Sequence, residues 1–221
     1  MVILPMRRGS NVESGFDPRL SQAIRENNIP RIEEVVAERP ELIDSNGVLG
    51  GGGWQHFAAR EGRLEALQRL FELGFSVNFR DGREGFFPVF SAVNGGHADV
   101  VAYLISLCQP LEVTPSVCNP LLGAISGGRS AECVRLLLDA GIDAGHRYSG
   151  GPRGEMTATA FALMHGLPGV ADMIAEHLAN GGAGKKEEIL SEAYRILKKQ
   201  PTLRPTRILP SEEDLEADEN D

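Results

Sequence analysis

The sequence lacks any long apolar run and any recognisable leader. None of its apolar stretches approaches the ~20 residues that a membrane-spanning helix needs. At the N-terminus the basic pair Arg7–Arg8 follows a very short apolar run, which is the reverse of the order in a secretory signal. We therefore expect a cytoplasmic protein, or a nuclear one in a eukaryotic host, with no membrane association.

Cysteine is scarce. The three cysteines, Cys108, Cys118 and Cys133, are odd in number, and none belongs to a Cys-x-x-Cys pair. This favours reduced thiols that fill helix or loop positions over a disulfide framework or a metal site. A redox or reactive role for Cys108 or Cys118 is the alternative.

The chain has no excess of positive charge. Its net charge is −9, but the residues after Pro210 include seven acids and no base. The rest of the chain holds 24 acidic and 22 basic residues, a net charge near −2. Nucleic-acid-binding domains usually carry a basic face, so we expect no nucleic-acid partner.

Catalytic and cofactor-binding motifs are also missing. The run Gly50–Gly53 lacks the Gly-Lys-Ser/Thr ending of a phosphate-binding loop, and neither Gly-x-Ser-x-Gly, His-Glu-x-x-His nor an EF-hand loop occurs. The five histidines have no nucleophile or carboxylate pattern around them. We expect a protein that is not an enzyme and needs no cofactor or metal.

What the sequence does contain is a segment that returns about every 33 residues. Each copy has a short apolar segment, a break, and a second segment with apolar residues at i, i+1, i+4 and i+5, as in Ala66, Leu67, Leu70 and Phe71. That spacing predicts a helix with one apolar stripe. The breaks fall at Asn27, Gly62, Gly96, Gly128 and Gly166. The pattern predicts a stack of helix pairs in which each unit depends on its neighbours for burial.

The copies resemble the ankyrin repeat, whose units follow the order Gly-x-Thr-Pro-Leu-His-x-Ala-Ala-x-x-Gly-His. The third copy matches at Pro88, Ala92, Gly96 and His97, and the fourth at Pro120, Leu121, Ala124 and Gly128. The resemblance covers roughly residues 16–182 as five repeats, with the outer two degenerate. It implies an all-α solenoid of helix-turn-helix units with finger loops. No unit has the full Thr-Pro-Leu-His tetrad, so we expect a somewhat irregular stack.

The flanking segments complete the expected organisation. Residues 1–15 look like a flexible N-terminal lead. Residues 185–200 carry an apolar stripe that predicts a C-terminal capping helix, with a detached helix awaiting a partner as the alternative. Residues 201–221 hold three prolines and the acidic run, which is typical of a disordered tail. A docking peptide or a polyanion mimic is the alternative for that tail.

The connectors carry turn signals. Asn46–Gly47, Asp81–Gly82 and Gly150–Gly151 favour tight turns because glycine, asparagine and aspartate tolerate positive φ. The connector Thr114–Ser116 lacks glycine, so its finger is expected to differ. The interval from Gly145 to Met156 is expected to form an extended loop.

If the chain resembles other ankyrin arrays, a protein partner contacts the finger tips and the exposed side of the first helices, which together form a concave face. Aromatic and arginine side chains contribute most to such interfaces. For Phe86, packing against the next unit is the alternative. The predicted contact residues are Trp54, Phe57, Arg60, Phe79, Arg80, Arg83, Phe86, Asn94, Tyr148, Arg153, Met164 and His165.

Three functions fit this pattern. The main hypothesis is a monomeric adaptor or scaffold that binds one protein partner without catalysis. The second is an inhibitor, such as a bacterial immunity protein that neutralises a toxin, although a near-neutral body argues mildly against it. The third is a regulator of an enzyme complex or an unrecognised enzyme.

Overall fold

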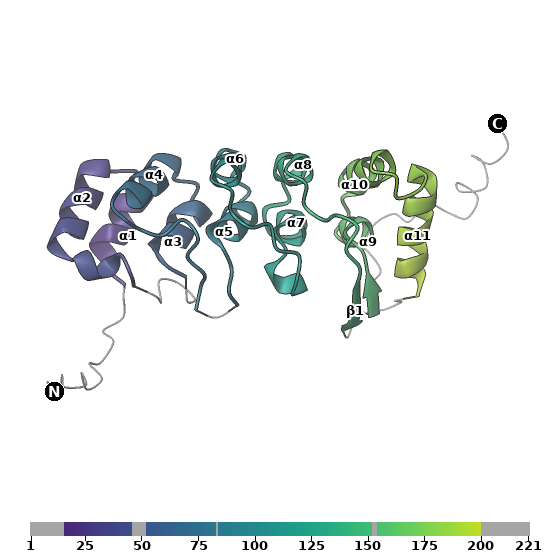
Figure 1. Cartoon of the computed structure of the whole chain (residues 1–221), viewed down its shortest axis with the longest axis horizontal. Coiled ribbons are helices and arrows are strands. Elements are labelled where there is room, and N and C mark those ends of the chain that lie inside the picture. Colours follow the sequence, from purple (N-terminus) through teal and green to yellow (C-terminus); the bar gives the residue numbers. More distant parts are fainter. Residues whose placement is uncertain (1–15, 46–51, 83, 152–153, 200–221) are drawn as a thin grey trace, which may run out of the picture.

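A computed structural model describes residues 16–45, 52–82, 84–151 and 154–199. Within these residues the chain forms a row of antiparallel helix pairs, which confirms the predicted all-α solenoid (Figure 1). The first helices are α1 (Pro18–Arg25), α3 (Trp54–Arg60), α5 (Pro88–Gly95), α7 (Pro120–Gly123) and α9 (Ala158–Met164). The second helices are α2 (Ile29–Glu38), α4 (Leu64–Glu72), α6 (Ala98–Ser106), α8 (Ala131–Asp139) and α10 (Pro168–Asn180).

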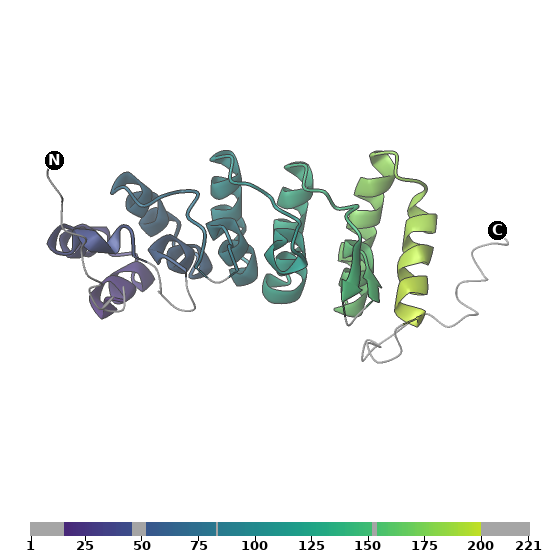
Figure 2. The same ribbon diagram turned by 60° about the horizontal axis from the view of Figure 1, so that its bottom comes forward.

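The two kinds of helix form separate layers. In Figure 1 the second helices α6, α8 and α10 lie above the first helices α5, α7 and α9. Helix α11 (Lys186–Lys198) packs against α9 and α10 at the far end of the row (Figure 2). It corresponds to the helix predicted at residues 185–200. The predicted lead at 1–15 and tail at 201–221 lie outside the described residues.

The first helices begin at residues that favour a helix start. Proline occupies the first turn of α1, α5 and α7, where its missing N–H is not needed. The side chains of Asp17, Asn119 and Thr157 accept hydrogen bonds from the backbone N–H groups of α1, α7 and α9. Such caps satisfy donors that a helix leaves unpaired. The sequence thus sets the starts of these helices locally.

The break between the two helices of a pair is a residue with positive φ. Asn27, Gly62, Gly96 and Gly166 take this conformation, as predicted, with φ of 53°, 65°, 77° and 70°. In the fourth unit the prediction of Gly128 is wrong, because Arg129 is the left-handed residue (φ 48°). The cause is a π-helix, η3 (Ala124–Gly128), that continues α7. This wider turn accommodates one more residue between the N-cap and the break than in the second, third and fifth units.

The connectors differ from the simple tight turns that were predicted. The pair Asn46–Gly47 lies outside the described residues. Asp81 closes its loop with its side chain, whose Oδ1 accepts hydrogen bonds from the N–H groups of Glu84 (3.0 Å) and Phe86 (2.9 Å). Gly150–Gly151 belongs to strand β1 (Tyr148–Gly151), which pairs with β2 (Gly154–Met156). The predicted extended loop is therefore an antiparallel ribbon.

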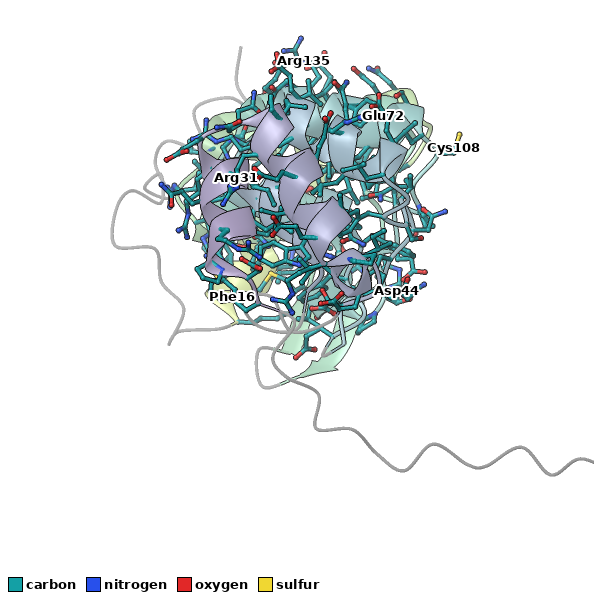
Figure 3. The ribbon with its side chains drawn as sticks, turned by 90° about the vertical axis from the view of Figure 1, so that its left-hand side faces the viewer. Phe16, Arg31, Asp44, Glu72, Cys108 and Arg135 are labelled. Atoms are coloured by element: carbon teal, nitrogen blue, oxygen red, sulfur yellow. The ribbon has the colours of Figure 1, made fainter. Side chains whose placement is uncertain are left out.

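The other short elements are 3₁₀ turns. η1 (Pro40–Leu42) follows α2, and η2 (Ser116–Cys118) occupies the connector without glycine, which therefore differs from its neighbours as predicted. Cys118 is buried there, Cys133 is buried on α8, and Cys108 is exposed on the outside of the stack (Figure 3). All three are free thiols.

Side-chain hydrogen bonds join successive repeats. Asn27 Oδ1 accepts from the Ala66 N–H (3.0 Å), and the ring Nε2 of His97 lies 2.9 Å from the carbonyl oxygen of Arg60. Gln109, which is buried, donates to the Val77 carbonyl and accepts from the Val89 N–H. Buried polar groups in folded proteins are nearly always hydrogen-bonded. These contacts between repeats therefore replace part of the hydrogen bonding that a complete Thr-Pro-Leu-His tetrad would provide.

Two predicted contact residues lie in the core. Trp54 is fully buried, and Phe57 exposes only 3% of its surface, so the expectation that they form an exposed contact surface was wrong. Phe16 stacks on the Trp54 indole at 5.9 Å, and Phe57 meets it edge-on at 6.1 Å. The guanidinium of Arg25 covers the Phe57 ring at 5.1 Å. The first repeat thus covers the face of α3 on which these rings lie.

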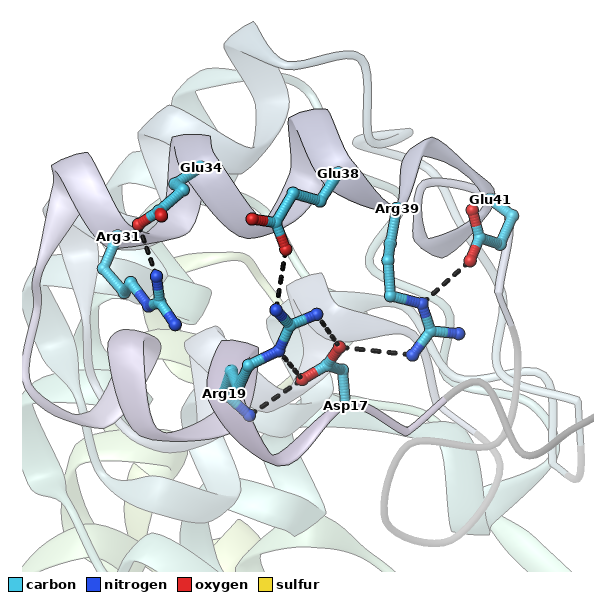
Figure 4. A network of polar contacts seen from close by, with 7 residues as sticks. All are labelled: Asp17, Arg19, Arg31, Glu34, Glu38, Arg39 and Glu41. Atoms are coloured by element: carbon cyan, nitrogen blue, oxygen red, sulfur yellow. Dashed lines mark hydrogen bonds and ion pairs between the residues drawn. The ribbon is translucent and has the colours of Figure 1, made fainter.

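A buried carboxylate closes the N-terminal end of the stack (Figure 4). Asp17 pairs with Arg19 at 3.0 Å and with Arg39 at 3.2 Å, and its side chain is 3% exposed. Burial acts to raise the pKa of Asp17, but hydrogen bonds from the two guanidinium groups outweigh it and lower the pKa from 3.8 to about 2. Asp17 therefore stabilises the fold as long as it is ionised.

We expect Asp17→Asn to lower the free energy of unfolding at pH 7 by about 2 kcal/mol, since a pKa unit corresponds to about 1.4 kcal/mol. The folded pKa of Asp17 lies below its unfolded value of 3.8, so this contribution is present above pH 3.8 and is lost as the pH falls towards 2. Urea unfolding of the wild type and of Asp17→Asn, from pH 7 down to about pH 2, measures the difference between their free energies of unfolding. Glu34→Gln, which breaks the exposed pair with Arg31, is the control and should change little. If the difference in free energy of unfolding between Asp17→Asn and the wild type did not change with pH, this account would be contradicted.

Candidate interaction surface

A hollow of ≈ 440 Å³ lies on the side of the stack formed by the first helices. The hollow lies over α3, α5 and the π-helix η3, so three repeats contribute to it. Cavities of about 300–1,000 Å³ are the size of small-ligand sites. Its lining includes His56, Arg60, Phe86, Phe90, Ser91 and Asn94.

An aromatic pair forms one wall of the hollow. The rings of Phe86 and Phe90 stack at 4.2 Å with an interplanar angle of 19°, and both side chains are half-buried. His56 holds Phe86 in place, because its Nε2 lies 2.9 Å from the Phe86 carbonyl oxygen. The pair therefore presents a firm apolar surface to the hollow.

The hydrogen bonds of His56 define its state. Its Nδ1 accepts from the Gly53 N–H at 3.2 Å, which leaves Nε2 as the atom that carries the proton and donates to Phe86. Burial lowers the pKa of His56, and the hydrogen bond to Phe86 and the charge of Asp81 offset this only in part. His56 is thus neutral near pH 7 and acts as a link between two repeats.

Three polar side chains at the hollow have no partner among the described residues. Arg60 is exposed, Ser91 and Asn94 are half-buried, and none of the three makes a side-chain hydrogen bond or ion pair in the part of the chain that the structure describes. Asp81 also reaches the hollow, but its Oδ1 is already bonded to two backbone N–H groups. Arg60, Ser91 and Asn94 are available to an external ligand.

Glycines allow the π-helix to approach α5. A Cβ at Gly127 would lie 2.3 Å from Asn94 Oδ1, and one at Gly128 would lie 2.1 Å from the Val93 carbonyl oxygen. At Gly127 the Asn94 side chain would have to move aside, whereas at Gly128 the close atoms belong to the backbone, so only glycine fits at position 128. π-Helical turns frequently occur at functional sites. Here the turn sets the wall of the hollow opposite α3.

The structure brings four of the predicted contact residues together. Phe57, Arg60, Phe86 and Asn94 all line the hollow, although Phe57 exposes only 3% of its surface. Arg80 instead pairs with Glu112 and lies over the Phe87 ring at 4.2 Å. The predicted contact residues Arg83 and Arg153 lie outside the residues whose side chains the structure describes.

The remaining predicted residues have other contacts. The ring of Phe79 meets His56 edge-on at 6.0 Å. The hydroxyl of Tyr148 donates to the Val113 carbonyl (2.8 Å) and accepts from Asn119, so this residue ties the β ribbon to the preceding repeats. Met164, the last residue of α9, and His165, its C-cap, are half-buried and do not line the hollow.

Sequence reasoning did not name Phe90 or Asp81 as contact residues. Phe90 follows Phe86 by four positions across the start of α5, and aromatic residues at this spacing can lie together on one side of a helix. That spacing could have indicated the pair. For Asp81, only the fold shows that its loop reaches the hollow.

Two negative observations apply to the described residues. No group of three or more histidine, cysteine, aspartate or glutamate side chains there could hold a metal ion. No helix in the same residues is long and apolar enough to cross a membrane.

The chain is similar to a known protein family. A family model described as ankyrin repeats, in three copies, matches residues 55–148. The matched segment runs from α3 to the start of β1 and includes every helix that lines the hollow. No curated protein matches the chain.

Proposed function

The chain is an ankyrin repeat protein, and on this basis we propose that it is a non-catalytic adaptor or scaffold that binds a protein partner through its first-helix face. Ankyrin repeats generally mediate protein–protein interaction and are typically not catalytic. The proposal assigns the central contact to the hollow between the second, third and fourth repeats. A partner of unknown identity is the expected ligand, and the chain itself is expected to be a monomer.

The observation that supports this assignment is the combination of half-buried aromatic rings with polar groups that have no partner in the part of the chain that the structure describes. Phe86 and Phe90 provide apolar area that is already held in place. Arg60, Ser91 and Asn94 surround them with unused hydrogen-bonding groups. Interface hot spots have this composition, with an aromatic or arginine anchor in a well-packed setting.

The charges at the hollow favour an adaptor over an inhibitor. Among the described residues that line it, Arg60 and Asp81 are the charged ones, and they are of opposite sign. Tight electrostatic inhibition of a toxin would be favoured by a surface with one strong charge. The free thiols fit a reducing compartment, so the proposal places the protein in the cytoplasm, or in the nucleus of a eukaryotic host.

Affinity capture from the native cell tests this proposal. We expect the wild-type chain to retain a specific protein that the double variant Arg60→Ala/Asn94→Ala retains about tenfold less, as for loss of one hot spot. The matched control is Arg63→Ala/Asn180→Ala, at two exposed positions outside the hollow.

Circular dichroism checks that both variants are folded. Equal retention of the partner by the hollow variant, or no protein retained above background by the wild type, would contradict the proposal.

A further inference from the structure

We propose that the hollow accepts an extended segment of the partner in which an aspartate or glutamate side chain lies within two residues of a large apolar side chain. This inference rests on the proposed function, because it specifies the chemistry of a partner at the same site. The inference follows from which side chains at the hollow already form hydrogen bonds or ion pairs within the protein and which do not.

Among the described residues that line the hollow, Arg60 is a cation without an ion pair. Its neighbours Arg25 and Arg80 are both engaged, Arg25 with Glu61 at 3.7 Å and Arg80 with Glu112. Arg60 has no such partner among the described residues, yet its backbone is fixed, since its carbonyl oxygen lies 2.9 Å from the His97 ring. A guanidinium group binds a carboxylate through two parallel hydrogen bonds. The matching group on the partner is therefore a carboxylate.

The aromatic pair specifies the neighbouring group. Phe86 and Phe90 line the same hollow as Arg60 and present half-buried ring surface. A leucine, isoleucine, methionine or phenylalanine of the partner would remove that surface from water, which stabilises a complex by about 25 cal/mol per Å² of apolar area. Because one hollow of ≈ 440 Å³ holds both features, the acidic and apolar side chains must be close together in the partner.

Asp81, Ser91 and Asn94 determine how the partner segment is oriented in the hollow. Asp81 repels a carboxylate, so the acidic side chain is directed to Arg60 rather than to the Asp81 end. Ser91 and Asn94 lie on α5 beside the rings and can each both donate and accept a hydrogen bond. They suit the peptide groups of an extended chain, whose N–H and C=O groups need partners once they leave water.

The protein itself contains a segment of the same chemistry. Asp214, Leu215 and Glu216 form an acidic–apolar–acidic sequence beyond the described residues. We assign the hollow to a separate partner, because Asp81 and the near-neutral body give no strong attraction for a tail with seven acids. Occupancy by residues 211–221 is a distinct outcome that the experiment recognises.

The probe is a library of random dodecapeptides displayed on phage, selected on the immobilised full-length chain. Enriched peptides are synthesised with a fluorescent label, and their affinities are measured by anisotropy. The same peptides are tested on Arg60→Glu, on the matched charge reversal Arg63→Glu, and on a chain that lacks residues 211–221. Arg63 is exposed and does not line the hollow.

We expect an enriched pattern with an acidic residue within two positions of a large apolar residue. Arg60→Glu should weaken these peptides by about a hundredfold, since it replaces a favourable charge pair with a repulsive one. Arg63→Glu should leave their affinity within about twofold, as expected for an exposed charge outside the site.

Other results would overturn the inference. These are a selection that enriches no peptide, a pattern without an acidic residue, or equal effects of the two charge reversals. Peptides that bind only after removal of residues 211–221 would assign the hollow to the chain's own tail. The proposed function fails separately, when the native partner is retained equally by the Arg60→Ala/Asn94→Ala variant.

Discussion

Trp54→Ala is expected to lower the free energy of unfolding by about 3–5 kcal/mol, the usual cost of truncating a large buried aromatic residue. The indole is fully buried, with Phe16 stacked on one face and Phe57 against its edge. Removing it leaves a cavity between the first and second repeats, which depend on each other for burial. Urea or thermal unfolding followed by circular dichroism measures the loss.

Phe16→Ala provides the comparison. Phe16 belongs to the same ring cluster but is 38% exposed, so its truncation should cost less than that of Trp54. A Trp54→Ala protein that is as stable as the wild type but binds its partner poorly would show that the indole is a contact residue after all. It would restore the surface predicted from the sequence.

Gly128→Ala is expected to have the next largest effect, a loss of about 3 kcal/mol in the free energy of unfolding, at the upper end for an overpacked site. A Cβ at this position would lie 2.1 Å from the Val93 carbonyl oxygen and 2.8 Å from the backbone nitrogen of Gly96. All of these are backbone atoms, so no side chain can rotate to make room. The third and fourth repeats would have to move apart.

The control for that substitution is Gly169→Ala in α10, where a Cβ would meet no atom within 4 Å. Alanine is favoured over glycine within a helix by about 1 kcal/mol, so this variant should be at least as stable as the wild type. Similar stability of the two alanine variants would contradict the close approach of η3 to α5. Because η3 forms a wall of the hollow, Gly128→Ala should also weaken partner binding.

The sequence was sufficient to predict the helix pairs and their order, because the period and the apolar stripes depend on local spacing. The left-handed break at Gly96 and the helix at residues 185–200 are examples. The π-helix was not predictable in this way. The π-helix depends on how one additional residue between the N-cap of α7 and the break packs against α5. The glycine at position 128 therefore suggested a break one residue before the observed one at Arg129.

The candidate site was less predictable, since it depends on contacts between repeats. Trp54 stands where ankyrin units usually have proline, and nothing in its own repeat shows that Phe16 covers it. Similarly, Arg60 and Arg80 are equivalent as sequence features. Only the fold shows that Arg80 is paired with Glu112, while Arg60 has no ion pair among the described residues.

Amide hydrogen exchange of the full chain, alone and with the captured partner, tests the central claim most directly. If the partner occupies the hollow, exchange should slow in α3, α5 and η3, while α4, α6 and α8 keep the rates of the free protein. Protection confined to these second helices, with unchanged rates around Arg60 and Phe90, would contradict binding through the first-helix face.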